Sequence, residues 1–187
     1  EVFENLTIPT ASAGIDQIMP CNVSSLQVTS TTSASTPSYA WTTIGGNIVS
    51  GSSTANAQVN AAGQYIITIT DINNGCTQSD TMIVTAAPIP TLALLSSTDV
   101  SCYGANDGQA SVQGSGGTSP YTIIWPGGGN GTGLNGGTYN VVLTDNYGCT
   151  ATLSVVIDEP NELLMSLTDT ISPDCGSSNG AIQVQTT

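Results

Sequence analysis

The chain has 187 residues, 13 carboxylate side chains and no Lys, Arg or His, and its formal net charge is −13. Without basic side chains it has no side-chain salt bridge and no cation for phosphate, which excludes nucleic-acid binding and attachment to acidic membrane surfaces. The apolar runs are short compared with the ~20 residues that span a bilayer, so we also expect no direct membrane insertion.

We expect residues 1–10 to be a linker or the end of a preceding segment, and residues 11–89 to form a first β-sandwich. In GQYIITIT the apolar side chains alternate from Tyr65 onward, and this period of two predicts a strand buried on one face. The Gly-x-Tyr sequence is typical of the tyrosine corner of Ig-like sandwiches, in which the phenol bonds to upstream backbone. Trp41 is expected in the core between two sheets, with sugar stacking as the alternative.

The stretch TDINNGCT, residues 70–77, is expected to be the turn that follows this strand. Asp71 lies where the strand ends, and an aspartate there caps the turn by accepting bonds from backbone amides two residues on. Calcium binding by Asp71 is the alternative.

The same order of features recurs in residues 90–160, which we expect to form a second β-sandwich. Trp125 takes the place of the first tryptophan, GTYNVVLT carries Tyr139 in the place of the corner tyrosine, and TDNYGCT repeats the turn. Asp107 and Asp145 precede turn glycines and have the same two interpretations, turn capping or calcium binding. Repetition of this kind predicts tandem modules of one architecture.

Residues 161–187 are expected to begin a further, incomplete repeat. Their CGSSNGAIQVQ resembles CYGANDGQASVQG of the second module, and no tryptophan or second cysteine follows before Thr187. Such a partial repeat cannot bury its own faces. The sequence is therefore expected to be either a window on a longer polypeptide or a filament subunit whose last module is completed by strands of a neighbour.

The five cysteines follow the order of the repeat, and they are Cys21, Cys76, Cys102, Cys149 and Cys175. We expect the disulfides Cys21–Cys76 and Cys102–Cys149, each closing one module, with the partner of Cys175 outside the sequence. Separations of 55 and 47 residues correspond to roughly 4 kcal/mol for each disulfide in the chain-entropy model. A zinc site is disfavoured because the chain has no His and no two cysteines lie close in sequence. Disulfides predict an oxidising, extracytoplasmic compartment.

The sequence offers no catalytic group. Without His or Lys, with no free cysteine expected and with scattered carboxylates, no nucleophile can be paired with a base. We therefore expect no enzyme activity, and no cofactor other than the calcium considered above.

Residues 99–160 resemble the SprB repeat, which occurs in large numbers in giant surface adhesins of gliding bacteria that use type IX secretion. The resemblance is carried by Cys102, Asp107-Gly108, Gly116-Gly117, Tyr121, Trp125, Gly137-x-Tyr139, Thr144-Asp145 and Gly148-Cys149. Residues 11–87 are similar to the PKD-like and Ig-like modules that accompany such repeats. The resemblance implies an extracellular array of β-sandwiches and brings no catalytic residues.

Two Asp-Thr-apolar sequences resemble the sites at which such bacteria attach O-glycans. They are DTM and DTI, in which Thr81 and Thr170 are the acceptor residues. The resemblance thus implies a glycoprotein, and an ordinary strand threonine is the alternative at each position.

The sequence therefore predicts an all-β chain of tandem Ig-like and PKD-like sandwiches in an extended array. The expected function is that of a non-catalytic structural and adhesive segment of a giant cell-surface adhesin or surface fibre outside the cell. Expected partners are neighbouring repeats of the same chain or fibre, and surface polysaccharide or other cells. The alternatives are the filament subunit and a carbohydrate-binding accessory module of a secreted enzyme, which would expose both tryptophans.

Overall fold

The computed structural model describes residues 7–186. The regular elements of this range are all β-strands, which confirms the all-β prediction. The described residues form no helix that is long and apolar enough to cross a membrane.

The chain divides into two compact units that interleave in sequence. The first runs to Thr91 and also contains Ser115–Thr122 and Leu143–Ala151; the second contains Leu92–Gly114, Ile123–Val142 and the residues from Thr152 onward. Residues 1–6 of the expected linker lie outside the described residues. The module boundaries expected from the sequence remain a prediction.

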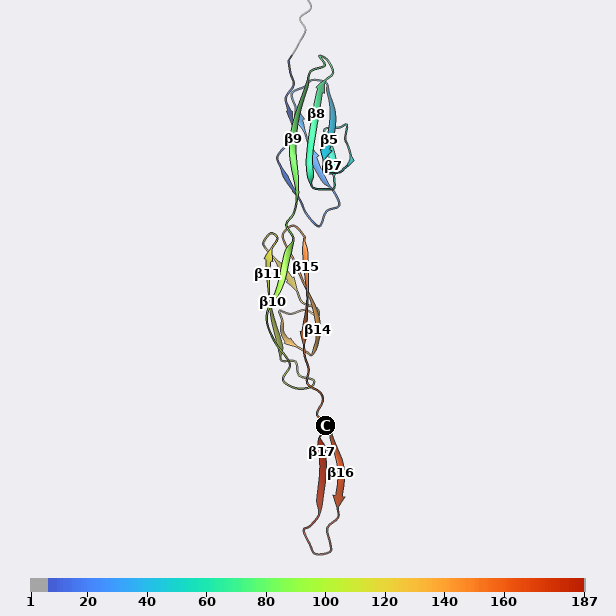
Figure 1. Cartoon of the computed structure of the whole chain (residues 1–187), viewed down its shortest axis with the longest axis vertical. Helices are drawn as coiled ribbons and strands as arrows, with labels where there is room; N and C mark the ends of the chain where they lie inside the picture. The colour runs from blue at the N-terminus through green and yellow to red at the C-terminus, as the bar shows by residue number, and fades with distance from the viewer. Residues whose placement is uncertain (1–6, 187) are drawn as a thin grey trace, which may run out of the picture. The chain divides into compact units, whose positions relative to one another are not determined.

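The first hydrophobic core lies between two sheets with strand orders β2-β9-β8-β5 and β3-β7-β6. The strands up to residue 86 are β1 (Ala11–Ser12), β2 (Gln17–Met19), β3 (Leu26–Thr29), β4 (Thr31–Thr32), β5 (Pro37–Ile44), β6 (Ile48–Ser50), β7 (Asn56–Val59), β8 (Gly63–Asp71) and β9 (Thr77–Ala86). Strand β8 pairs antiparallel with β5 on one side and β9 on the other (Figure 1). Strand β2 pairs parallel with β9, and β1 pairs with β4.

Strand β8 shows why this sequence forms a one-sided strand. Tyr65, Ile67 and Ile69 are fully buried, whereas the side chains between them are only half-buried. They pack with Trp41 of β5 and Val28 of β3, so the facing sheets share one apolar layer. The alternation predicted from the sequence is confirmed.

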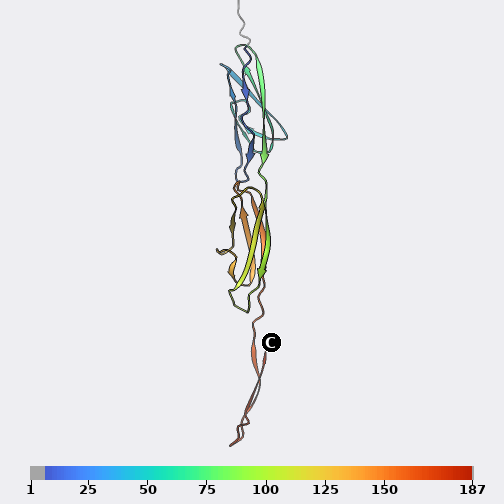
Figure 2. The same cartoon turned by 90° about the vertical axis from the view of Figure 1, so that its left-hand side faces the viewer.

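The second hydrophobic core lies between sheets with strand orders β10-β11-β13 and β12-β14-β15. These strands are β10 (Pro90–Thr98), β11 (Gly108–Gly116), β12 (Thr122–Ile124), β13 (Thr132–Leu134), β14 (Gly137–Thr144) and β15 (Thr150–Ile157). Figure 2 shows the same strands turned by 90° from the view of Figure 1. Trp125, Val141 and Ile157 form the centre of this core. The second core is therefore built from residues at the repeat positions that also form the first core.

The last two strands, β16 (Met165–Ile171) and β17 (Ala181–Thr186), pair antiparallel with each other (Figure 1). Every residue of both strands is exposed. Leu167 lies opposite Val184 in the register, and these side chains are 61% and 54% exposed. The hairpin thus has an apolar face that no described residue covers.

Candidate functional site

The turn after β14 is held by one buried carboxylate. Asp145 Oδ1 accepts hydrogen bonds from the backbone N–H groups of Tyr147 and Cys149, each at 2.9 Å. Its Oδ2 accepts another from the N–H of Thr118, also at 2.9 Å. Partial burial alone would raise the pKa of Asp145, but these three bonds outweigh it and lower the pKa below the ordinary value. Asp145 is therefore an ionised anchor for the turn.

Asp71 fixes the corresponding turn after β8. Its Oδ1 accepts bonds from the N–H of Asn73 and the hydroxyl of Thr36, both at 3.0 Å, and Oδ2 accepts a long bond from Ser35 N–H at 3.4 Å. The bond from Asn73 is the main cause of the lowered pKa of Asp71. Both turns have the capping arrangement that the sequence favours.

Asp107 accepts a backbone hydrogen bond within the loop between β10 and β11. Its Oδ1 accepts a 3.0 Å bond from the N–H of Ser101, and hydrogen bonds from the Ser101 hydroxyl and N–H lower its pKa. Over residues 7–186 no three His, Cys, Asp or Glu side chains gather as a metal site would require. Calcium binding by these aspartates stays a prediction that no cluster of described side chains supports.

The three lowered pKa values predict an acid-dependent loss of stability. A carboxylate with a lowered folded-state pKa stabilises the fold above its unfolded value of about 3.9, and this contribution is lost as the pH falls through the folded value. We expect Asp145→Asn to lower the thermal midpoint at pH 7, and its difference from the unchanged chain to shrink as the pH falls below the unfolded value. Acid also neutralises the other carboxylates and so reduces their mutual repulsion. This effect is the same in the variant and in the unchanged chain, so it cancels in the difference between them. A difference that stays the same as the pH falls would contradict this role.

The disulfide of this structure joins Cys21 to Cys149, so the expected pairs Cys21–Cys76 and Cys102–Cys149 are wrong. The S–S distance is 2.00 Å, the Cα atoms are 4.9 Å apart, and the separation in sequence is 128 residues. Cys76, Cys102 and Cys175 are free thiols.

Strand direction explains why the expected pairs do not form. Strand β2 runs parallel to β9, and its last residue pairs with the last residue of β9. Cys21, which follows β2, therefore lies near the end of β9, whereas Cys76 lies directly before its beginning. The ten residues of β9 separate these positions by about 30 Å, far beyond the ~7 Å that a disulfide allows between Cα atoms.

The second expected pair fails for the same reason. Val100, two residues before Cys102, donates its N–H to the carbonyl of Asp158 at 3.2 Å, just beyond the end of β15. Cys149 precedes the beginning of that strand. Its eight residues separate the two cysteines by about 25 Å.

The loop that carries Cys21 packs closely on the turn that carries Cys149. Cys21 N–H donates to the carbonyl of Tyr147 at 2.9 Å. Gly148 has a φ of +71°, and a Cβ at this position would lie 2.6 Å from the Cβ of Asn22. The sequence gives no signal for the contact with Asn22 apart from the glycine that precedes the cysteine.

Gly75 and Gly148 form a matched pair for testing this contact. Gly75 has nearly the same φ, +70°, but a Cβ there would meet no atom within 4 Å. We expect Gly75→Ala to cost about 1–2 kcal/mol through backbone strain alone. Gly148→Ala should cost more, because the loop must also move away. Equal shifts of the denaturation midpoint would show that Asn22 does not press on the turn.

Both corner tyrosines bond to upstream backbone, as the sequence predicts. Tyr65 OH donates to the carbonyl of Ala61 at 2.6 Å and accepts from the N–H of Asn47 at 3.0 Å. Tyr139 OH donates to the carbonyl of Asn135 and accepts from its N–H, both at 3.0 Å. In each module the carbonyl lies four residues before the tyrosine, which fixes the entry into the strand.

Removing these hydroxyls should have unequal effects. Tyr65 is fully buried and its hydroxyl bonds are partly buried, so Tyr65→Phe leaves partly buried backbone groups without a partner and should cost roughly 1–3 kcal/mol. The bonds of Tyr139 lie at an exposed position, where water replaces the hydroxyl, and Tyr139→Phe should cost less than about 1 kcal/mol. Chemical denaturation of the two variants measures both values. The reverse ranking would contradict the buried corner in the first module.

Trp41 and Trp125 occupy core positions, with 4% and 5% of their surfaces exposed. Trp41 Nε1 donates to the carbonyl of Thr54 at 3.1 Å, and the Trp125 ring meets the ring of Tyr139 edge-on at a centroid distance of 6.4 Å. The exposed pair of tryptophans that a carbohydrate-binding module would need is therefore not present.

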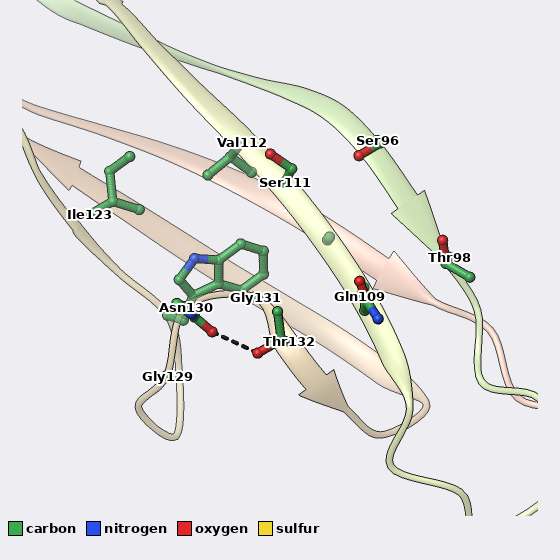
Figure 3. A pocket seen from close by; sticks show the side chains of 12 residues that line it. Ser96, Thr98, Gln109, Ser111, Val112, Ile123, Gly129, Asn130, Gly131 and Thr132 are labelled. Atoms are coloured by element: carbon green, nitrogen blue, oxygen red, sulfur yellow. Dashed lines mark hydrogen bonds between the residues drawn. The ribbon is translucent and has the colours of Figure 1, made fainter.

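An open groove of about 460 Å³ has Trp125 among its lining residues. Figure 3 shows Gln109 and Ser111 along β11, with Asn130 and Thr132 on the neighbouring segment; Asn130 Oδ1 accepts a 2.7 Å bond from the Thr132 hydroxyl. The groove was not predicted, because its walls come from a glycine-rich loop and from strands distant in sequence. None of its lining residues is titratable, so it offers hydrogen bonds and apolar contact but no acid, base or nucleophile.

Both candidate glycosylation sites lie on strand surfaces. Thr81 is exposed on β9, and Thr170 is exposed on β16. The neighbouring Asp80 accepts the N–H of Ala13 at 2.8 Å through Oδ2, so the first aspartate has a structural role as well.

The chain is similar to one known family and to several solved structures. Residues 94–130, from β10 to the loop before β13, match the model of the SprB repeat. No curated protein sequence matches the chain.

The solved structures that match the chain share little sequence with it. A fragment of titin with three Ig domains has a TM-score of 0.38 and 11% identity, and the match covers 96% of this chain and 76% of the fragment. A C-terminal fragment of intimin, solved with the intimin-binding domain of its translocated receptor, has a TM-score of 0.37 and 14% identity over 86% of this chain and 66% of the fragment. The N-terminal four Ig domains of Dscam1 give 0.34 and 11% over 82% of this chain, which spans only 46% of that structure.

Proposed function

We propose that this chain, which carries a SprB repeat at residues 94–130, is a non-catalytic segment of a giant cell-surface adhesin or surface fibre. The observation that carries the proposal is the match to that repeat. Such repeats belong to surface adhesins exported by type IX secretion, so we assign the chain to the outside of the cell. The disulfide Cys21–Cys149 supports this location, because disulfides persist in oxidising compartments and are rare in the cytosol.

The proposed role is mechanical and adhesive. Sandwiches with separate cores resist force along the chain, and a disulfide limits how far a pulled segment extends. The partners we propose are neighbouring repeats of the same chain or fibre, and surface polysaccharide or other cells. The groove beside Trp125 supports binding rather than catalysis, because its lining is polar but without titratable groups.

Glycosylation of Thr81 and Thr170 is part of the proposal. Their exposure supports it, because a glycosyltransferase needs an accessible hydroxyl. Mass spectrometry of the protein from its own cells should find a hexose-containing mass increment on the peptides with DTM and DTI. If both peptides carry no sugar, the proposed glycosylation is wrong.

Immunogold labelling of intact cells tests the proposed location. Antibodies raised against the 187-residue chain should decorate the outer surface without permeabilisation. Proteinase K added to intact cells should abolish the label. Trypsin cannot cut within the chain, which has no Lys or Arg, and it serves as the matched control for cell integrity. Labelling that needs permeabilised cells would overturn the proposal.

The β16–β17 hairpin favours a second candidate, in which the chain is a filament subunit completed by its neighbour. Ile182 and Val184 correspond in the repeat to Ala110 and Val112, which belong to the second core. In the hairpin the same face is exposed, with Ile182 at 71% and Val184 at 54%. A second sheet from another copy would bury this face and supply the missing half of a sandwich.

Sedimentation over a range of concentrations tests this candidate, with the free thiols of Cys76, Cys102 and Cys175 alkylated so that disulfides between molecules do not imitate assembly. Val184→Asp places a charge on the apolar face and should abolish assembly. Gln183→Asp places it on the opposite face of the strand, because side chains alternate, and should leave assembly unchanged. A chain that sediments as a monomer at every concentration would exclude the filament candidate and leave the adhesin proposal intact.

A further inference from the structure

The repeat contains two kinds of cysteine. Loop cysteines precede the Gly-x-Tyr strand of their repeat, and turn cysteines end the turn that follows it. The loop cysteines are Cys21, Cys102 and Cys175, and the turn cysteines are Cys76 and Cys149. In both complete repeats the two kinds lie at opposite ends of the last strand, β9 or β15, so neither repeat can close its own disulfide.

The disulfide that forms follows a rule of succession. Cys21 is the loop cysteine of the first repeat, and Cys149 is the turn cysteine of the second. We propose that the same linkage continues along the array. Cys76, Cys102 and Cys175 would each form a disulfide with a cysteine of the other kind in a neighbouring copy of the repeat. This inference rests on the proposed function, because it requires further copies of the repeat.

The turn that carries Cys76 has the shape of the turn that carries Cys149. Asp71 N–H donates to the carbonyl of Cys76 at 2.9 Å, as Asp145 N–H does to that of Cys149 at 3.0 Å. Gly75 N–H donates to Asp71 at 2.8 Å, as Gly148 N–H does to Asp145 at 3.0 Å. The first turn is one residue longer, but it presents its cysteine after a glycine of the same conformation.

The surroundings of the two turns differ. Asn74 of the first turn donates its side-chain amide to the carbonyl of Thr7 at 2.9 Å, and no described loop like that of Cys21 lies on its glycine. The loop residue Asn22 lies against Gly148, whereas the Cβ position of Gly75 is open. The glycine side of the Cys76 turn is therefore open at the position where Asn22 lies against the other turn. A neighbouring copy of the repeat supplies such a loop, with its cysteine at the place of Cys102 or Cys175.

The three thiols are accessible to a second repeat. Cys102 and Cys175 are exposed, and Cys76 is half-buried in its turn. None of them has a cysteine partner within the chain. The two loop cysteines therefore need turn cysteines from other copies, and Cys76 needs a loop cysteine.

Formation of each bond requires a disulfide oxidant such as glutathione disulfide. A thiolate of one repeat attacks the oxidant, forms a mixed disulfide and releases one glutathione thiolate. The thiolate of the second repeat then attacks the mixed disulfide and releases the other. Two protein thiols lose two protons and two electrons, and one glutathione disulfide becomes two glutathione molecules.

Disulfide mapping of the purified chain tests the proposal. Equal amounts of ¹⁵N-labelled and unlabelled chain are held in a glutathione redox buffer, alkylated, and digested with pepsin without reduction. Mixed-isotope peptides identify bonds between molecules. We expect Cys76 to be joined to Cys102 or Cys175 about ten times more often than to another turn cysteine, and more often than loop cysteines are joined to each other. A tenfold ratio corresponds to a preference of about 1.4 kcal/mol for pairing a loop with a turn.

Cys76→Ser removes the free turn cysteine and should abolish the intermolecular bonds between unlike cysteines. Cys175→Ser leaves Cys102 as a loop partner and should preserve them. A mixture with as many Cys76–Cys76 or Cys102–Cys175 pairs, or no intermolecular bond while Cys21–Cys149 forms, would overturn the proposal. Because purified protein is used, the result is independent of the cell-surface location, which immunogold labelling tests separately.

Discussion

Removing the Cys21–Cys149 disulfide with Cys21→Ser is expected to lower the free energy of unfolding by about 5 kcal/mol. The bond spans 128 residues, and in the chain-entropy model a loop of that length gives about this value. Typical domains have only about 5–15 kcal/mol of stability, so the loss would be a large part of the total. Cys21 is exposed, and serine there adds no buried polar group, unlike a change at Cys149, which is 2% exposed.

Equilibrium unfolding in guanidinium chloride measures this loss. Cys102→Ser is the matched control, because Cys102 is a free, exposed thiol whose replacement should change the midpoint little. Dithiothreitol should lower the midpoint of the unchanged chain to that of Cys21→Ser and leave the variant unaffected. Equal stability of Cys21→Ser and Cys102→Ser would show that the bond does not restrain the fold.

The second large effect is expected when the chain is pulled from its ends. The oxidised bond removes 128 residues from the length that force can extend, which corresponds to about 440 Å of fully extended chain. Single-molecule force spectroscopy of Cys21→Ser should therefore show about this much additional contour length over the unchanged chain. Cys102→Ser should match the unchanged chain.

The size of the increment distinguishes the pairings. If Cys102 were joined to Cys149, replacing Cys102 would release 47 residues, or about 160 Å. If Cys21 were joined to Cys76, Cys21→Ser would release 55 residues, or about 190 Å. Either shorter increment would contradict the Cys21–Cys149 bond.

Much of the fold could be predicted from sequence because the relevant signals are local. The alternation from Tyr65 identified β8 and its buried face, and Gly-x-Tyr identified both tyrosine corners. Asp71 and Asp145 were placed in their turns by the glycines that follow them. Each of these features depends on residues within one strand or one turn.

The disulfide could not be predicted in the same way, because it depends on strand direction. Pairing each cysteine with the next assumes that loop and turn lie at the same end of a module. The parallel pairing of β2 with β9 places Cys21 at the far end from Cys76, and a two-residue period carries no information about direction. The contact between Asn22 and Gly148 and the groove beside Trp125 were missed for the same reason, since they join segments distant in sequence.

We propose that the protein works outside the cytoplasm, and the structure joins its first loop cysteine to the turn cysteine of the next repeat. The most direct measurement is disulfide mapping of the protein from its own cells, quenched with a thiol-alkylating reagent and digested with pepsin without reduction. We expect one linked peptide pair that contains Cys21 and Cys149. Alkylated thiols at these positions, or linked Cys21–Cys76 and Cys102–Cys149 peptides, would contradict it.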